Sequence, residues 1–234
     1  MTPITALGSR YGIQGALGRS VKRAAVGGGW WDLNGTITSC VAAYQPKGAA
    51  DLAASYVNLA HPGTYDCALG TAPTFDASYG WSFATVSSQY LKTGVAPTNN
   101  QTWSMIVRYS DAAASVGCIA GAVGNSPYPE FKICGRYTSD VIRVSNGNKQ
   151  EKAPSLLAGV LAVAGTTAYR NGALDITDIG AITGTIPQIY IGARDLFGTS
   201  LDEKATVKVQ ALAIYNATLT STQVGLLTTA MAAL

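Results

Sequence analysis

From residue 30 onward, apolar and polar residues alternate over short stretches, and turn-forming residues interrupt these stretches about every 8 to 15 positions. This pattern is typical of the strands of a β-sandwich or barrel. The segment 102–109 shows it best, because its odd positions from Trp103 to Tyr109 are apolar and share one face, whereas Arg108 falls on the other. We expect strands at residues 36–44, 55–59, 80–83, 89–93, 102–109, 117–123, 130–137, 141–145, 157–164, 166–170, 186–191 and 206–215.

Two Asn-Gly pairs mark hairpin turns between the predicted strands. Asn171-Gly172 can supply the two consecutive positive φ angles that a type I′ turn requires, and it lies between the apolar residues Tyr169 and Leu174. Residues 146–147 repeat the pair and predict a second turn of the same kind.

The chain ends in a segment with helical rather than strand periodicity. Thr220 with Gln223 three positions later forms a capping box. Apolar residues follow at helical spacing, and we expect them to pack against the sandwich rather than bind a cofactor. These residues are Val224, Leu227, Met231 and Leu234.

Residues 1–29 differ from the rest and predict an extended N-terminal arm, followed by a sandwich domain at 30–234. The arm contains no acidic residue before its glycine hinge at 27–29. It could dock on a partner or serve as an untethered solubilising tail. Its four cations are the predicted partner-docking residues: Arg10, Arg19, Lys22 and Arg23.

Composition excludes several classes of protein. Of the 234 residues, 47% are hydrophobic and 12% charged, so the chain can fill a core while its surface carries little charge. The net charge is +3, and the arm alone carries +4, so the near-neutral body argues against nucleic-acid binding. The longest apolar run, 156–164, is too short to cross a membrane. No signal-peptide pattern occurs near the start of the sequence, which favours synthesis in a cytosol.

Four segments, in matching order, resemble the laminin G-like branch of the concanavalin A-like jelly rolls, a branch common in bacterial surface and bacteriophage structural proteins. The resemblance implies an all-β antiparallel sandwich with jelly-roll topology and one short C-terminal helix. The matching segments are Gly70 with Pro73 and Gly80-Trp81-Ser82-Phe83 before Tyr90-Leu91, then Tyr169-Arg170-Asn171-Gly172, then Ile189-Tyr190-Ile191-Gly192, and finally residues 213–220.

Metal binding is not predicted. Many members of the resembled family carry an acidic pair before the last strand, where this chain has Val209-Gln210-Ala211-Leu212. We interpret the nearest carboxylates, Asp195, Asp202 and Glu203, as a solvated acidic loop.

The four cysteines, Cys40, Cys67, Cys118 and Cys134, lack metal-ligand spacing and are expected to be buried thiols. If the chain turns near Ser126, Cys118 and Cys134 lie opposite one another, and their pairing stays open.

No catalytic residue or cofactor site emerges from the short-range motifs. None of the three glutamates, Glu130, Glu151 and Glu203, has a second carboxylate two or four positions later, as a glycosidase strand requires. The single histidine, His61, precedes a proline in a turn and is interpreted as structural or exposed. Tyr128, between two prolines, is the candidate for stacking on a sugar, although it could also fold over the sandwich edge.

The sequence therefore predicts a non-enzymatic, virion-associated structural, decoration or adhesion protein of a phage, attached through its arm to other virion proteins and to copies of itself. A lectin-like module that binds bacterial surface glycan through Tyr128 is the first alternative. A divergent glycoside hydrolase is the second.

Overall fold

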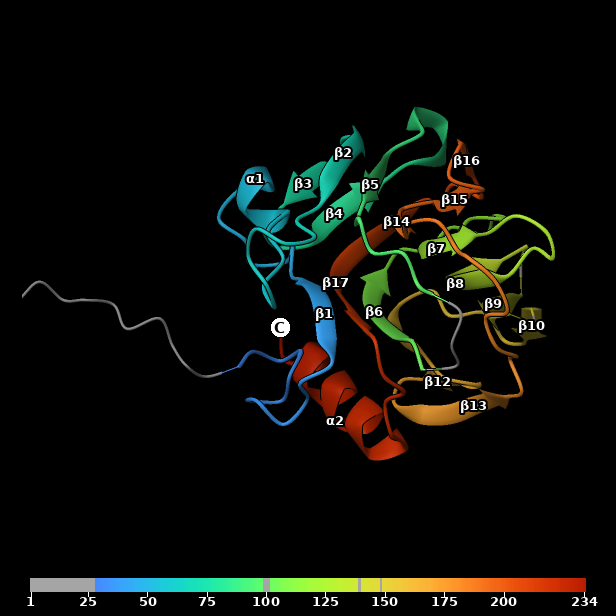
Figure 1. Ribbon diagram of the computed structural model, residues 1–234. Coiled ribbons are helices and arrows are strands. Elements are labelled where there is room, and N and C mark those ends of the chain that lie inside the picture. Colours follow the sequence, from blue (N-terminus) through green and yellow to red (C-terminus); the bar gives the residue numbers. More distant parts are fainter. Residues whose placement is uncertain (1–27, 99–101, 139, 148) are drawn as a thin grey trace, which may run out of the picture.

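Two β-sheets lie face to face in the computed structural model, which describes residues 28–98, 102–138, 140–147 and 149–234 (Figure 1). The first sheet has the order β13-β12-β11-β6-β17-β4-β3, with β1 beside the second half of β17. Its strands are β1 (Cys40–Tyr44), β3 (Thr74–Asp76), β4 (Gly80–Phe83), β6 (Ser104–Ser110), β11 (Gly159–Ala164), β12 (Thr167–Arg170), β13 (Ala173–Thr177) and β17 (Val207–Tyr215).

The second sheet has the order β10-β9-β8-β7-β14-β5-β2, and a short hairpin of β15 and β16 attaches to β7. Neighbouring strands are antiparallel except for β15 and β7, which run parallel. The strands are β2 (Ala68–Thr71), β5 (Tyr90–Lys92), β7 (Ala120–Val123), β8 (Glu130–Tyr137), β9 (Val141–Asn146), β10 (Lys149–Lys152), β14 (Tyr190–Ile191), β15 (Arg194–Leu196) and β16 (Ser200–Asp202).

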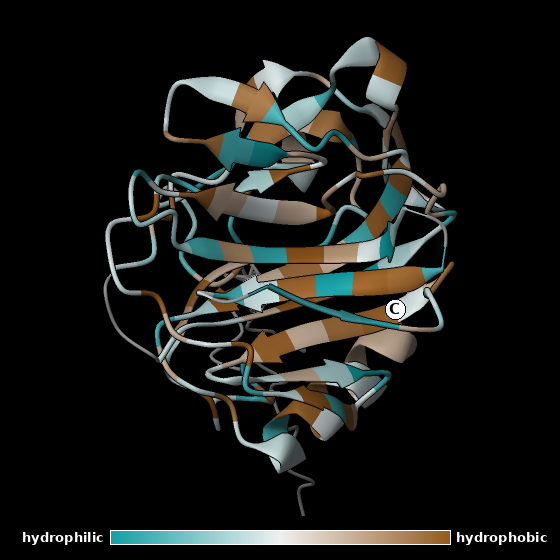
Figure 2. Cartoon of the chain, turned by 90° about the vertical axis from the view of Figure 1, so that its right-hand side faces the viewer, coloured by the Kyte–Doolittle hydropathy of each residue, from teal (hydrophilic) through white to brown (hydrophobic). Residues whose placement is uncertain are grey.

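Alternation along the strands builds the core between the sheets. Met105 and Val107 of β6 point into this core, where they join Phe131 and Ile133 of β8. Figure 2 shows the resulting change between hydrophobic and hydrophilic positions along single strands. The predicted face of the segment 102–109 is therefore confirmed.

The helix α2 (Ser221–Ala232) covers the outer face of the first sheet. Its capping box forms as predicted, with the Thr220 hydroxyl accepting from the Gln223 backbone N–H at 3.2 Å. Leu227 and Met231 are fully buried in a second apolar cluster that also contains Ile106 of β6. The first sheet is therefore apolar on both faces.

The hairpin between β12 and β13 confirms the predicted Asn-Gly turn. Asn171 has a φ of 49° and Gly172 a φ of 82°, the pair of positive angles that a type I′ turn needs. Strands β9 and β10 also form a hairpin near the second Asn-Gly pair, but Asn146 is the last residue of β9 and only Gly147 of the pair has a positive φ, 108°, so the predicted turn of the same kind does not form there.

Residues 55–59 do not form the predicted strand. The first of them, Ser55, ends the short helix α1 (Leu52–Ser55), which is capped by Asp51, whose Oδ1 accepts from the Ala54 N–H at 2.7 Å. Asn58 is fully buried, and its side chain bonds the backbone of β1, accepting from Ala43 at 2.9 Å and donating to Val41 at 2.9 Å. Because this amide replaces a strand's backbone groups, the segment stays a loop.

Other differences concern short elements. A 3-10 turn, η1 (Thr85–Ser87), follows β4, and the predicted strand at 186–191 shortens to β14. The predicted strands did not include β2, β3, β10, β13, β15 and β16, which have three to five residues each and many exposed or charged positions. The two-sheet architecture and the C-terminal helix are as expected.

The predicted arm lies almost wholly outside the described residues, which begin at 28, and so do all four of its cations. Their docking role stays a prediction. Among the residues that the structure describes, no helix is both long and apolar enough to span a membrane.

Candidate functional site

A pocket of about 340 Å³ lies where three loops of the second sheet meet. The first loop is the turn between β7 and β8, the second is the segment before β14, and the third is the turn between β15 and β16. Figure 1 shows the strands that carry the first and third turns side by side, as the β7 and β15 pairing requires. The lining residues are Gly124, Asn125, Ser126, Thr185, Pro187 and Phe197.

The turn between β7 and β8 holds Tyr128 outward. The Tyr128 N–H donates to the carbonyl of Asn125 at 2.9 Å, and the Gly124 N–H donates to the carbonyl of Pro129 at 2.8 Å. The side chain of Tyr128 is 60% exposed. Of the two orientations that the sequence left open, the ring adopts the outward one.

The turn between β15 and β16 brings a second aromatic ring to the pocket. The Phe197 N–H donates to the carbonyl of Val123 on β7 at 2.9 Å, and the next N–H, that of Gly198, donates to Asp195 Oδ1 at 2.9 Å. The rings of Phe197 and Tyr128 are 5.7 Å apart between centroids, with an interplanar angle of 49°.

Both aromatic residues have left-handed backbone conformations, with φ of 66° at Tyr128 and 61° at Phe197. Such a φ is costly for a bulky side chain and persists only where neighbouring bonds impose it. Strain alone does not identify a site, because the exposed Tyr65 also has a φ of 59°. The pair at residues 128 and 197 differs from Tyr65 because the rings contact each other beside a pocket.

Close backbone approach fixes the middle loop against the β7–β8 turn. A Cβ on Gly124 would lie 2.0 Å from the carbonyl oxygen of Thr185, so only glycine permits this contact. The contact brings the Thr185 and Pro187 side of the pocket to the Asn125 side.

An ion cluster joins the β15–β16 hairpin to β8. It contains Glu130, Lys132, Arg194, Asp202 and Glu203. Lys132 has no exposed surface, and its Nζ lies 3.3 Å from Glu130 and 3.0 Å from Glu203. Arg194 lies 2.8 Å from Glu130 and 3.3 Å from Glu203, and it also pairs with Asp202. The cluster ties the hairpin that carries Phe197 to strand β8.

The interpretation of residues 195, 202 and 203 as a solvated acidic loop is wrong for two of them. Asp195 is fully buried, because it lies on β15 beside β7, and burial raises the pKa of its carboxyl. The Glu203 side chain is 10% exposed and enters the ion cluster. Asp202 keeps 44% of its side chain exposed.

Cys118 and Cys134 lie next to this cluster, with their sulfur atoms 3.3 Å apart and both side chains fully buried. The predicted proximity follows from the β7–β8 hairpin, and both are free thiols. Burial raises the pKa of the Cys118 thiol well above its ordinary range. These sulfurs and a Glu203 oxygen lie within 4.8 Å of one another, but the Lys132 ammonium already bonds this carboxylate as its cation.

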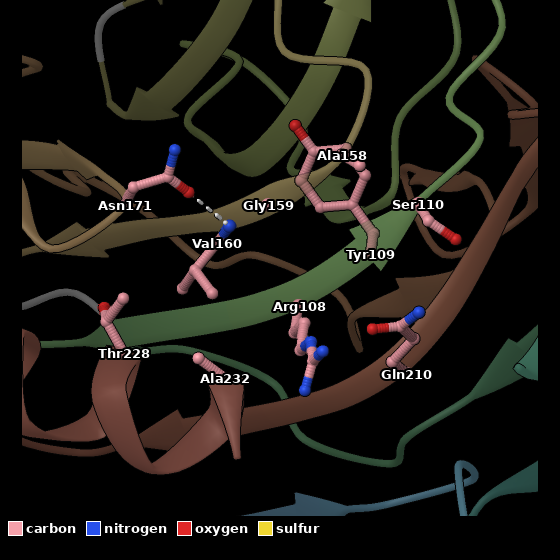
Figure 3. A pocket seen from close by; sticks show the side chains of 10 residues that line it. All are labelled: Arg108, Tyr109, Ser110, Ala158, Gly159, Val160, Asn171, Gln210, Thr228 and Ala232. Carbon is pink, nitrogen blue, oxygen red and sulfur yellow. Dashed lines mark hydrogen bonds between the residues drawn. The ribbon is translucent and has the colours of Figure 1, made fainter. Parts of the chain in front are cut away.

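A larger hollow of about 460 Å³ lies on the other sheet, between strands β6, β11 and β17 and helix α2 (Figure 3). Arg108, Asn171 and Gln210 line it together with apolar groups. Arg108 donates to the carbonyls of Met231 and Leu234 at the end of the helix, and Asn171 Oδ1 accepts from the Val160 N–H at 2.9 Å. Arg108 therefore helps to join the helix to the sheet, whereas Asn171 joins the β12–β13 turn to β11.

Of the predicted site residues, Tyr128 lies beside this pocket through its ring contact with Phe197, although it is not one of the lining residues. His61 lines a different pocket, of about 260 Å³, and its Nε2 lies 2.9 Å from the Cys40 carbonyl oxygen. The sequence analysis missed Phe197 and Thr185, because their roles depend on loops that are distant in the chain. The Phe-Gly pair at 197–198 was the available signal for a turn.

No known protein family matches this chain, and no curated protein matches it. Among solved structures, the fold is similar to a Trypanosoma rangeli sialidase in complex with 2,3-difluorosialic acid, with 12% identity and a TM-score of 0.53 over 83% of this chain and 33% of the sialidase. It is also similar to a mutant of that sialidase with trans-sialidase activity, with 15% identity and a TM-score of 0.51 over 82% and 33%. The chain thus spans about a third of the length of these proteins, and the likeness is one of fold.

These neighbours contradict the prediction of a non-enzymatic phage structural protein, which is therefore wrong. The similar structures are sialidases, which are glycoside hydrolases. The prediction was based on the family resemblance, the missing catalytic groups, the missing export signal and the low-charge surface. Missing short-range motifs cannot show which side chains the loops bring together. The predicted virion location and partners stay predictions.

Proposed function

We propose that this chain is a glycan-binding β-sandwich that holds a sugar ring at the pocket beside Tyr128 and Phe197. The observation that carries the proposal is the pair of contacting rings, both in left-handed backbone conformations, at the rim of a pocket with polar walls. The sialidase-like fold supports the same class of ligand.

The chemistry of the pocket matches a sugar. An aromatic ring packs against the apolar face of a pyranose, while amides and hydroxyls bond its hydroxyl groups. Tyr128 supplies an exposed ring, and Asn125, Ser126 and Thr185 supply an amide and two hydroxyls. At about 340 Å³ the pocket is at the small end of ligand sites, which favours one or two sugar units.

We also propose that the sandwich has the concanavalin A-like jelly-roll topology. The order of the two sheets, the C-terminal helix packed outside the first sheet and the sialidase-like fold support this assignment. A solved structure of this chain whose strand connections differ from a jelly roll would contradict it.

Binding is tested with a glycan array followed by calorimetry on the ligands that bind. We expect Tyr128→Ala and Phe197→Ala each to weaken binding about tenfold, since a lost ring contact of roughly 1.4 kcal/mol corresponds to that factor. Tyr65→Ala is the matched control, because this tyrosine is 45% exposed with a similar φ, whereas the ring that contacts Phe197 at the pocket is that of Tyr128. Equal binding by all four proteins, or no binding of any glycan, contradicts the proposal.

A second candidate function, hydrolysis of a glycosidic bond, is favoured by the placement of Glu130 and Glu203. Both carboxylates contact Lys132 Nζ, at 3.3 and 3.0 Å, so these oxygen atoms lie no more than roughly 6 Å apart, a limit that includes the separation of about 5 to 5.5 Å in retaining glycosidases. Release of reducing ends from polysaccharide tests it. Activity lost in a Glu203→Gln variant that urea unfolding shows to be folded, but kept in Glu151→Gln, supports this function. Activity kept in both variants, or no activity of the wild type, contradicts it.

A further inference from the structure

We infer that the pocket beside Tyr128 and Phe197 selects uncharged sugars over acidic ones such as sialic and uronic acids. This inference rests on the proposed glycan-binding function and adds the chemical class of the ligand. Its basis is the charge of the groups that form the pocket and surround its loops.

None of the described residues that line the pocket is charged. The polar side chains are Asn125, Ser126 and Thr185. An amide and a hydroxyl both donate and accept hydrogen bonds, as a sugar hydroxyl does. They suit a neutral polyol, whereas a carboxylate accepts hydrogen bonds only and is best bound by a cation.

The nearest charged residues along the three loops do not supply a free cation. Glu130 follows the first turn, and Arg194 and Asp195 precede the third. Arg194 is committed to the ion cluster, at 2.8 Å from Glu130 and paired with Asp202. Asp195 is acidic and accepts from the Gly198 N–H. A sugar carboxylate in the pocket would lose water without gaining a cationic partner among the residues that line it.

The hollow on the other sheet makes the contrast clear. Arg108 lies in that hollow, so the molecule does have a cavity with a cationic wall, about 460 Å³ in volume (Figure 3). The pocket beside Tyr128 has no equivalent residue among those that line it. The two cavities therefore differ in the charge that they offer a ligand.

The test compares neutral and acidic forms of the same sugars on the wild-type chain by calorimetry. N-acetyllactosamine is measured against its sialylated form, and xylobiose against its glucuronic-acid-substituted form. We expect the acidic form to bind at least about tenfold more weakly. We also expect binding of the neutral form to change less than twofold between low and high salt, because no ion pair is involved.

The outcomes separate this inference from the proposed function. Acidic sugars that bind as tightly as neutral ones, with binding lost in Tyr128→Ala, overturn the inference and leave glycan binding intact. If neither form of any sugar binds, the proposed function fails and the inference fails with it. Neutral preference that is lost in Tyr128→Ala and kept in Tyr65→Ala supports both.

A charge introduced at the pocket gives an independent measurement. Thr185→Lys places a cation at the exposed wall, and we expect the ratio of acidic to neutral affinity to rise at least threefold. Thr177→Lys adds the same charge to an exposed position on β13 of the other sheet and should leave the ratio unchanged. Equal ratios in the two lysine variants count against the inference.

Discussion

Replacing Lys132 by Met tests whether the ion cluster holds the β15–β16 hairpin in place. Lys132 is fully buried and contacts two carboxylates, so Lys132→Met leaves Glu130 and Glu203 close together with less positive charge. Removing one member of a buried ion pair costs about 3 to 5 kcal/mol of unfolding free energy. Arg194 still contacts both carboxylates, which places our expectation at the lower end, about 3 kcal/mol.

The measurement is urea unfolding of the wild type, of Lys132→Met and Glu203→Gln, and of the double variant. Because the two side chains are in direct contact, we expect the double variant to lose at least about 1 kcal/mol less than the sum of the two single losses. An unfolding free energy of Lys132→Met within about 1 kcal/mol of the wild-type value would refute the role of the ion cluster in holding the hairpin. Single losses of unfolding free energy that simply add in the double variant would refute it too.

The pH dependence of the same difference follows from the pKa of Lys132. Burial lowers this pKa, whereas the sulfurs of Cys118 and Cys134 and the carboxylates of Glu203 and Glu130 raise it, and the net direction is upward from 10.5. A raised pKa means that the folded state holds this proton more tightly than the unfolded chain does. The stability advantage over Lys132→Met should therefore be constant from neutral pH up to about 10.5 and shrink as the pH rises further.

Three further predictions concern the helix and the thiols. Leu227→Ala should lower the unfolding free energy in urea by about 2 to 5 kcal/mol, because the Leu227 side chain is fully buried. Leu226 is 53% exposed, so Leu226→Ala is the control and should change the unfolding free energy by less than about 0.5 kcal/mol. Thr220→Ala removes the capping box and should cost about 0.5 to 2 kcal/mol in the same assay, and an unchanged midpoint would contradict the role of the cap. Cys118 and Cys134 should resist alkylation in the folded protein and react fully in urea, because burial shields both thiols and raises the pKa of Cys118. Mass spectrometry follows the labelling, and rapid labelling of the folded protein would argue against this burial.

Local patterns in the sequence determined the elements of the fold. The strands at 80–83 and 130–137 have the predicted bounds, since each is bounded by turn residues and dominated by strand-forming ones. The capping box and the Asn-Gly turn also depend on residues within a few positions of each other, so the sequence alone indicates them. The loop at residues 55–59 was not predicted, because the buried Asn58 amide bonds Ala43 and Val41, which lie 15 and 17 positions earlier.

The candidate site could be predicted only in part. The prolines beside Tyr128 indicated an exposed ring, which the structure has at 60% exposure. Its neighbour Phe197 is 69 positions away and reaches it because β15 pairs with β7.

The same physical reason explains the acidic residues. Glu130 and Glu203 show no catalytic spacing in the sequence, yet both contact the ammonium of Lys132 in the structure. The order in which strands pair decides such contacts, because it joins segments that chain spacing keeps apart. The sequence thus determined strands, turns and cap, while strand order and loop packing alone decided which side chains form the pocket and the ion cluster.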